Sequence, residues 1–96
     1  MRHNALRVQM LEAEWQSEVI RVATQYGWTT YHTHDSRRST SGFPDLVMVH
    51  PKHGIVYAEL KTDTGKTSVS QEAWLALLKA HTEHVYVWRP RDAEAA

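Results

Sequence analysis

Asp45, Glu59 and Lys61 are residues of the types that a metal-dependent phosphodiesterase centre needs. Two carboxylates can hold one or two Mg²⁺ or Mn²⁺ ions, which neutralise charge on a phosphorane-like transition state and polarise the attacking water. A lysine beside them can orient or deprotonate the nucleophile, and its ammonium can also contact a phosphate as a point charge. These residue types suit hydrolysis of a phosphodiester, provided that the chain brings the three side chains together.

A β-hairpin would bring them together. Residues 46–49 and 55–60 are short apolar runs rich in branched side chains, and residues 51–54 between them are typical of a turn. The sequence therefore predicts two antiparallel strands, with Pro44 fixing the backbone at the entry to the first of them.

The length of the turn decides which side chains face each other. With a three-residue turn Asp45 lies directly opposite Glu59, where facing Cβ atoms are about 4.5–5.5 Å apart. A four-residue turn would set Asp45 against Leu60, unless a bulge restored the register. Since side chains alternate along a strand, Glu59 and Lys61 point to the same face, so the ammonium joins the carboxylates in the first register.

The segments before the hairpin predict a helix and a strand. Apolar residues at steps of three and four indicate a helix over about residues 10–26, with Gly27 suited to its C-terminal cap. Residues 28–34 are β-prone and are expected to form the first strand. The polar segment 35–42 is expected to be a loop.

The segments after the hairpin predict a second helix and a last strand. Ser68 and Gln71 fit a capping box that opens a helix ending near residues 81–83. A strand is expected over residues 84–88, and the polar residues from Pro90 onward show no evident fold. The helix between the last two strands is then a crossover that should be right-handed and pack on the sheet. We therefore expect an α/β fold with a small mixed sheet flanked by helices.

Composition narrows the class of protein. The 96 residues are expected to form a single domain over 1–96, with a core at about 10–90 and a short, flexible C-terminal tail. Eleven Lys and Arg balance eleven Asp and Glu, which is not typical of a generic nucleic-acid binder but is compatible with a carboxylate cluster that binds cations.

The chain contains no cysteine, so any metal must be held by oxygen or nitrogen. Because no segment has the pattern of a membrane span or a secretory signal, we expect a soluble cytoplasmic protein with no membrane partner.

The segment Gly42-Phe43-Pro44-Asp45, together with Glu59-Leu60-Lys61, resembles the PD-(D/E)xK nuclease signature. The wider pattern is similar to the VRR-NUC domain (virus-type replication-repair nuclease) in its small stand-alone form, which is often phage-encoded; it adds Gly27-Trp28, residues 32–39, Ser68, Gln71 and Trp74. This resemblance implies a restriction-endonuclease-like core and a Mg²⁺- or Mn²⁺-dependent DNA endonuclease in a bacterial or phage-infected cell. In this family, stand-alone domains are associated with homodimers that cut branched DNA such as four-way junctions, and fused domains act on flaps. The resemblance therefore implies a homodimer with activity like that of a Holliday-junction resolvase.

The resemblance assigns roles by position: metal ligation to Asp45, Glu59 and the Leu60 backbone carbonyl, catalysis to Lys61, and a polar contact from the second helix to Gln71. Spacing alone leaves Gln71 a second interpretation, because the third helical residue of a capping box needs no role in a site.

Folds of this type usually add a glutamate from the first helix to the metal site. Glu12 matches that position best, Glu18 ranks second, and Glu14 is a further candidate. The sequence leaves this ligand open. His32 and His34, two apart on one strand, could also be ligands, although a surface or hydrogen-bonded role suits them better because two carboxylates already provide a site.

Five residues are candidates for contacts with DNA phosphates: Ser36, Arg37, Arg38, Ser39 and Lys66. The arginine pair could instead only keep a loop soluble. Two rival functions fit the chain less well. A non-catalytic DNA-binding module gives no reason for an intact acidic pair with its lysine, and a sequence-specific restriction-type nuclease needs base-reading elements for which 96 residues leave little room.

Overall fold

The computed structural model describes residues 10–33 and 40–95. Their helices and strands follow one another in the order α2 (Glu12–Gln25), β1 (Thr29–His32), β2 (Leu46–His50), β3 (Gly54–Leu60), α3 (Val69–Lys79), β4 (Val85–Trp88) and α4 (Pro90–Ala95). The four strands form one sheet in the order β1-β2-β3-β4. The first three are mutually antiparallel, and β4 runs parallel to β3 after the α3 crossover. The expected small mixed sheet flanked by helices is confirmed.

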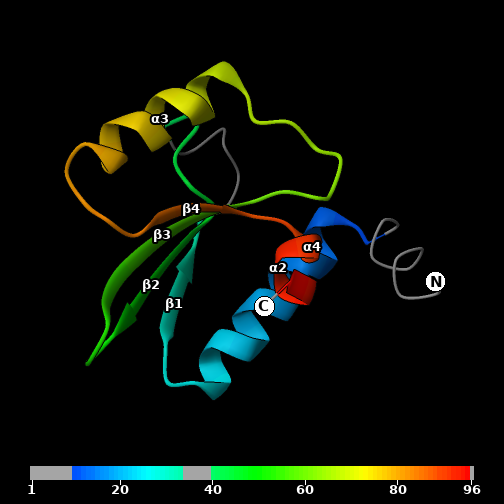
Figure 1. Ribbon diagram of the computed structural model, residues 1–96, viewed down its shortest axis with the longest axis vertical. Coiled ribbons are helices and arrows are strands. Elements are labelled where there is room, and N and C mark those ends of the chain that lie inside the picture. Colours follow the sequence, from blue (N-terminus) through cyan, green and yellow to red (C-terminus); the bar gives the residue numbers. More distant parts are fainter. Residues whose placement is uncertain (1–9, 34–39, 96) are drawn as a thin grey trace.

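The two faces of the sheet are covered by different helices (Figure 1). One face packs against α2 and supplies the main core, which contains Trp15 and Ala23 of the helix and the alternate strand residues Leu46, Met48, Val56, Ala58 and Leu60. The other face meets α3, where the Phe43 ring lies edge-on between Trp74 at 5.1 Å and Tyr57 at 6.2 Å. Odd-numbered residues of β3 therefore face α3, and even-numbered residues face α2.

Helix α2 ends at the glycine that the sequence predicts. Tyr26 is the C-cap, the Gly27 N–H donates to the Thr24 carbonyl at 3.1 Å, and the Trp28 N–H donates to the Ala23 carbonyl at 3.0 Å. This pair of bonds satisfies carbonyls that a free helix end would leave unpaired. At the opposite end of α2, the Trp15 indole donates to the Trp88 carbonyl at 3.0 Å, which ties the helix to the end of β4.

The hairpin has the shorter of the two possible turns. His50 pairs with Gly54, so residues 51–53 form a three-residue loop. Gly54 has φ +81°, the left-handed conformation that closes a hairpin loop of this length.

Two expectations need correction. Residues from Pro90 onward were expected to have no fold, but residues 90–95 form α4. A proline suits the first turn of a helix, and the Arg89 N–H donates to the Asp92 carboxylate at 2.7 Å. The other expectation concerned the end of the second helix, which stops at Lys79 instead of residues 81–83. Among the residues that the structure describes, no helix is both long enough and apolar enough to span a membrane.

Candidate active site

The hairpin register brings Asp45 beside Glu59. Leu46 pairs with Ala58, and the next residue outward on each strand is Asp45 and Glu59. The Asp45 Oδ2 atom also accepts the Leu60 backbone N–H at 2.9 Å, which fixes the carboxylate at the end of β3. Because the N–H and C=O of a strand residue point to the same neighbouring strand, the Leu60 carbonyl is on the Asp45 side as well.

Glu59 is a buried carboxylate with an unusual environment. Its side chain is 1% exposed, and its Oε2 atom accepts the Gln71 side-chain amide at 2.9 Å. The Lys61 Nζ atom lies 3.7 Å from the same oxygen, with 12% of the lysine side chain exposed. The other oxygen, Oε1, has no hydrogen-bond partner among the described residues. A buried carboxylate oxygen without a partner raises the free energy of the folded state, which makes Glu59 Oε1 a candidate to bind a proton or a cation.

The protonation of Glu59 reflects this environment. Burial raises the pKa of Glu59 to about 8; the negative charge of Asp45 adds to the rise, and the Lys61 ammonium opposes it. Two ionised carboxylates can only accept hydrogen bonds, so a proton or a cation must lie between them. A raised pKa at an acidic pair is typical of functional sites.

Gln71 joins α3 to the site while also capping the helix. Its side-chain oxygen accepts the Ser68 N–H at 2.7 Å, and its own N–H donates to the Ser68 hydroxyl at 3.2 Å. The side-chain nitrogen is left to donate to Glu59. Gln71 therefore both caps the helix and contacts Glu59, because the amide uses a different atom for each contact.

The loop before Asp45 lies directly on the start of α3. Gly42 has φ +95°, and a Cβ placed there would lie 2.5 Å from the backbone carbon and oxygen of Ser70. Ser41 and Ser70 hydroxyls are 3.2 Å apart across the same contact. Only glycine allows this approach, which holds the Asp45 segment against the helix that carries Gln71.

The residues present fit a hard divalent cation. Asp45 and Glu59 supply carboxylate oxygens, one of them without a partner, and the Leu60 carbonyl lies on the same side. In residues 10–33 and 40–95, no group of three or more His, Cys, Asp or Glu side chains could hold a metal ion. Mg²⁺ keeps several water ligands, so two or three protein oxygens are sufficient for it.

Among the described residues, none of the helical glutamates joins this pair in a group of three that could hold a metal ion. Glu12 is exposed in the first turn of α2, and the Glu14 carboxylate caps the Leu11 N–H at 2.9 Å. Glu18 is bound to Arg21 at 2.6 Å on the helix that covers the opposite face of the sheet from Glu59. His32 is also on that opposite face, because it pairs with Leu46.

The structure describes only one of the five residues that were predicted to contact DNA phosphates. Ser36, Arg37, Arg38, Ser39 and also His34 lie outside the described residues. Lys66 is exposed on the loop between Lys61 and α3.

A hairpin carrying an acidic pair and a lysine, followed by an α crossover to a parallel strand, defines the PD-(D/E)xK nuclease fold. Within that class, the family model of the VRR-NUC domain matches residues 4–92 of the 96 in this chain. The chain belongs to the VRR-NUC family. It is therefore a nuclease-type domain with DNA as its substrate. No curated protein and no solved structure matches the chain.

Proposed function

We propose that this domain is a Mg²⁺- or Mn²⁺-dependent endonuclease that selects branched DNA by its shape and cuts four-way junctions in the manner of a Holliday-junction resolvase. The observation that carries the chemistry is the buried Glu59 carboxylate, which has one oxygen without a partner beside Asp45 and Lys61. Two neighbouring carboxylates, one of them buried, are stabilised by a cation between them, and in a nuclease that cation is a metal ion.

Each side chain has a distinct part in the proposed mechanism. Asp45, Glu59 and the Leu60 carbonyl would hold the ion, which supplies Lewis-acid polarisation of the phosphate and the attacking water. Gln71 holds Glu59 in one orientation through its amide. The Lys61 ammonium, 3.7 Å from Glu59, would orient the nucleophile or contact the scissile phosphate.

Selection of shape over base sequence is supported by the size of the domain. A 96-residue chain with a balanced charge has few elements with which to read base edges in a groove. Contacts from the segment Ser36–Ser39 and from Lys66 to the phosphate backbone would position the DNA without specifying a sequence.

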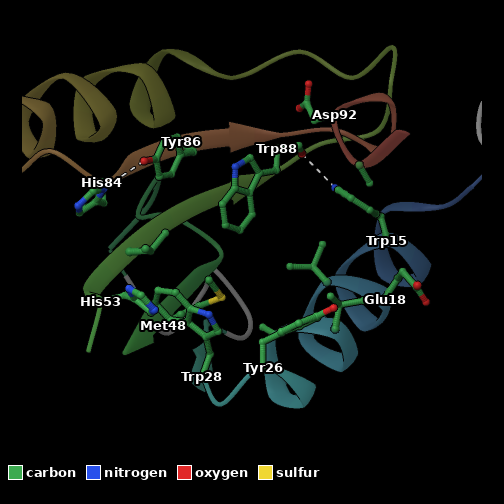
Figure 2. A pocket seen from close by; sticks show the side chains of 15 residues that line it. Trp15, Glu18, Tyr26, Trp28, Met48, His53, His84, Tyr86, Trp88 and Asp92 are labelled. Atoms are coloured by element: carbon green, nitrogen blue, oxygen red, sulfur yellow. Dashed lines mark hydrogen bonds between the residues drawn. The ribbon is translucent and has the colours of Figure 1, made fainter. Parts of the chain in front are cut away.

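We propose that two copies of the chain act together, because two active sites related by a two-fold axis suit the opposing strands of a junction. The surface that supports a dimer is the α2 groove, a cavity of about 660 Å³ on the α2 side of the sheet. Figure 2 shows the aromatic residues that surround it, and its apolar lining includes Trp15, Val22, Tyr26, Trp28, Tyr86 and Trp88. Apolar surface of this kind is a frequent mark of protein contact.

Cleavage of a small DNA panel tests the proposed activity. Labelled duplex, flap, splayed arm and four-way junction are incubated with Mg²⁺, with Mn²⁺ or with EDTA. The proposal requires cutting of branched DNA that depends on the metal, and Glu59→Gln should abolish cutting while junction binding persists in metal-free buffer. Cleavage by Glu59→Gln, or equal cutting of plain duplex, would defeat it.

Sedimentation tests the dimer separately. Val22 lines the α2 groove with 38% of its surface exposed, whereas Leu77 is 56% exposed on α3 and lies outside the lining. Val22→Glu should convert a dimer to monomers, and Leu77→Glu should leave it intact. A wild-type chain that sediments as a monomer at micromolar concentration would exclude the homodimer.

A further inference from the structure

The loop that follows Lys61 forms a turn beside the stem of that lysine. Gly65 donates its N–H to the Thr62 hydroxyl at 2.9 Å, closing a tight turn. A Cβ built on Gly65 would lie 3.7 Å from Lys61 Cδ, so Gly65 lies close to the lysine stem. The lysine side chain is 12% exposed, and this turn is one of the segments beside it.

Arg89 holds this turn from the end of β4. Its Nη1 atom donates to the Thr62 carbonyl and to the Gly65 carbonyl, each at 2.6 Å. Charged donors at such short distances form the stronger class of hydrogen bond. Both ends of the turn are therefore fastened to one guanidinium nitrogen.

The backbone of Arg89 is itself fixed. The Lys61 N–H donates to the Trp88 carbonyl at 3.0 Å, so the residue before Arg89 is bonded to the candidate catalytic lysine. The Arg89 N–H is capped by Asp92 at 2.7 Å, at the start of α4. Arg91 adds a second link, because its backbone N–H donates to the Asp63 carboxylate at 3.0 Å.

We infer that Arg89 is a positioning residue for Lys61, and that it acts by clamping the Thr62–Gly65 turn against the lysine stem. The inference rests on the catalytic role proposed above for Lys61. Sequence reasoning gave Arg89 no role, since a contact from a side chain to distant backbone carbonyls leaves no periodic pattern.

The functional test compares two arginines on the same short segment. Arg89→Met removes the two carbonyl contacts and keeps an apolar stem, whereas Arg91→Met removes the same charge from an exposed side chain that makes one weaker contact at 3.3 Å. Single-turnover cleavage of a junction should slow by about 10²-fold in Arg89→Met, the usual effect of a small misplacement of a reacting group. Junction affinity in metal-free buffer should not change, and Arg91→Met should cleave like the wild type. In a Lys61→Met background, Arg89→Met should cause no additional loss.

A second readout needs no cleavage at all. The rate at which Lys61 is acylated, measured by mass spectrometry with Lys79 as internal reference, should rise in Arg89→Met because the stem is released. Arg89→Lys, which keeps a donor and provides a milder change if Arg89→Met does not fold, should show a smaller rise.

The outcomes separate this inference from the proposed function. If the wild type cuts no DNA but the Lys61 acylation rate rises in Arg89→Met, the nuclease proposal fails and the clamp stands. Unchanged acylation of Lys61, a cleavage rate equal to that of Arg91→Met, or a loss that adds to that of Lys61→Met would each overturn the clamp.

Discussion

Gln71 donates its side-chain amide to Glu59 across 2.9 Å while its side-chain oxygen caps the helix on which it lies. One residue thus links the start of α3 to the buried carboxylate. The orientation of Glu59 and the integrity of the helix cap are therefore coupled in this fold.

Gln71→Met and Ser68→Ala separate the two roles. Each change weakens the cap and should lower the free energy of unfolding by about 1 kcal/mol in urea titrations. Only Gln71→Met also removes the donor to Glu59, so it alone should lose about 10–100-fold in metal affinity or cleavage, as partners of metal ligands typically do. Equal cleavage by the two variants would mean that Gln71 acts as a cap and nothing more.

Glu59 should give the metal-free protein a distinctive dependence of stability on pH. Its pKa is raised from an ordinary 4.5 to about 8, so between these values the folded state holds a proton that the unfolded chain has released. The free energy of unfolding should then fall as pH rises through this window, with a slope of up to about 1.4 kcal/mol per pH unit from this group. Below the ordinary value both states are protonated, and the contribution is constant.

Urea denaturation in EDTA buffers measures this slope, and Glu59→Gln is the control because an amide does not titrate. The difference in unfolding free energy between variant and wild type should grow in favour of the variant from about pH 5 to about pH 8. Parallel curves for the two proteins would show that Glu59 has an ordinary pKa.

Gly42 should be far less tolerant of substitution than Gly54. Both have positive φ, but a Cβ at Gly42 collides with the Ser70 backbone at 2.5 Å, whereas a Cβ at Gly54 meets nothing within 4 Å. Gly54→Ala should cost about 1–2 kcal/mol from backbone conformation alone. Gly42→Ala should cost more and should also slow cleavage, because the Asp45 segment must move away from α3. Thermal denaturation and junction cleavage compare the two, and a similar loss in both would contradict the close packing of this loop.

Much of the site could be predicted from the sequence because local rules govern it. The turn residues 51–54 specify a hairpin, and its three-residue form places Asp45 beside Glu59 by register alone. The capping box at Ser68 predicts where α3 starts, and hence that Gln71 lies in its first turn. Each of these inferences depends on residues that are close in the sequence.

The features that were not predicted depend on contacts between distant parts of the chain. The helix α4 has local signals in Pro90 and Asp92, but its alanine-rich composition resembles that of a tail. The clamp of Arg89 on the Thr62–Gly65 turn spans more than twenty residues and needs the parallel placement of β4. The choice among helical glutamates depends on how α2 is rotated on the sheet, which an apolar stripe defines only coarsely.

Titration with Mn²⁺ tests the central claim most directly, since free Mn²⁺ can be counted by electron paramagnetic resonance with no DNA present. At about pH 8, the wild type and Glu18→Gln should bind the ion equally, because Glu18 is paired with Arg21 away from the site. Asp45→Asn and Glu59→Gln should each abolish that binding, since both carboxylates are needed to hold one ion. Binding that persists unchanged in the Asp45→Asn, Glu59→Gln double variant would contradict the account.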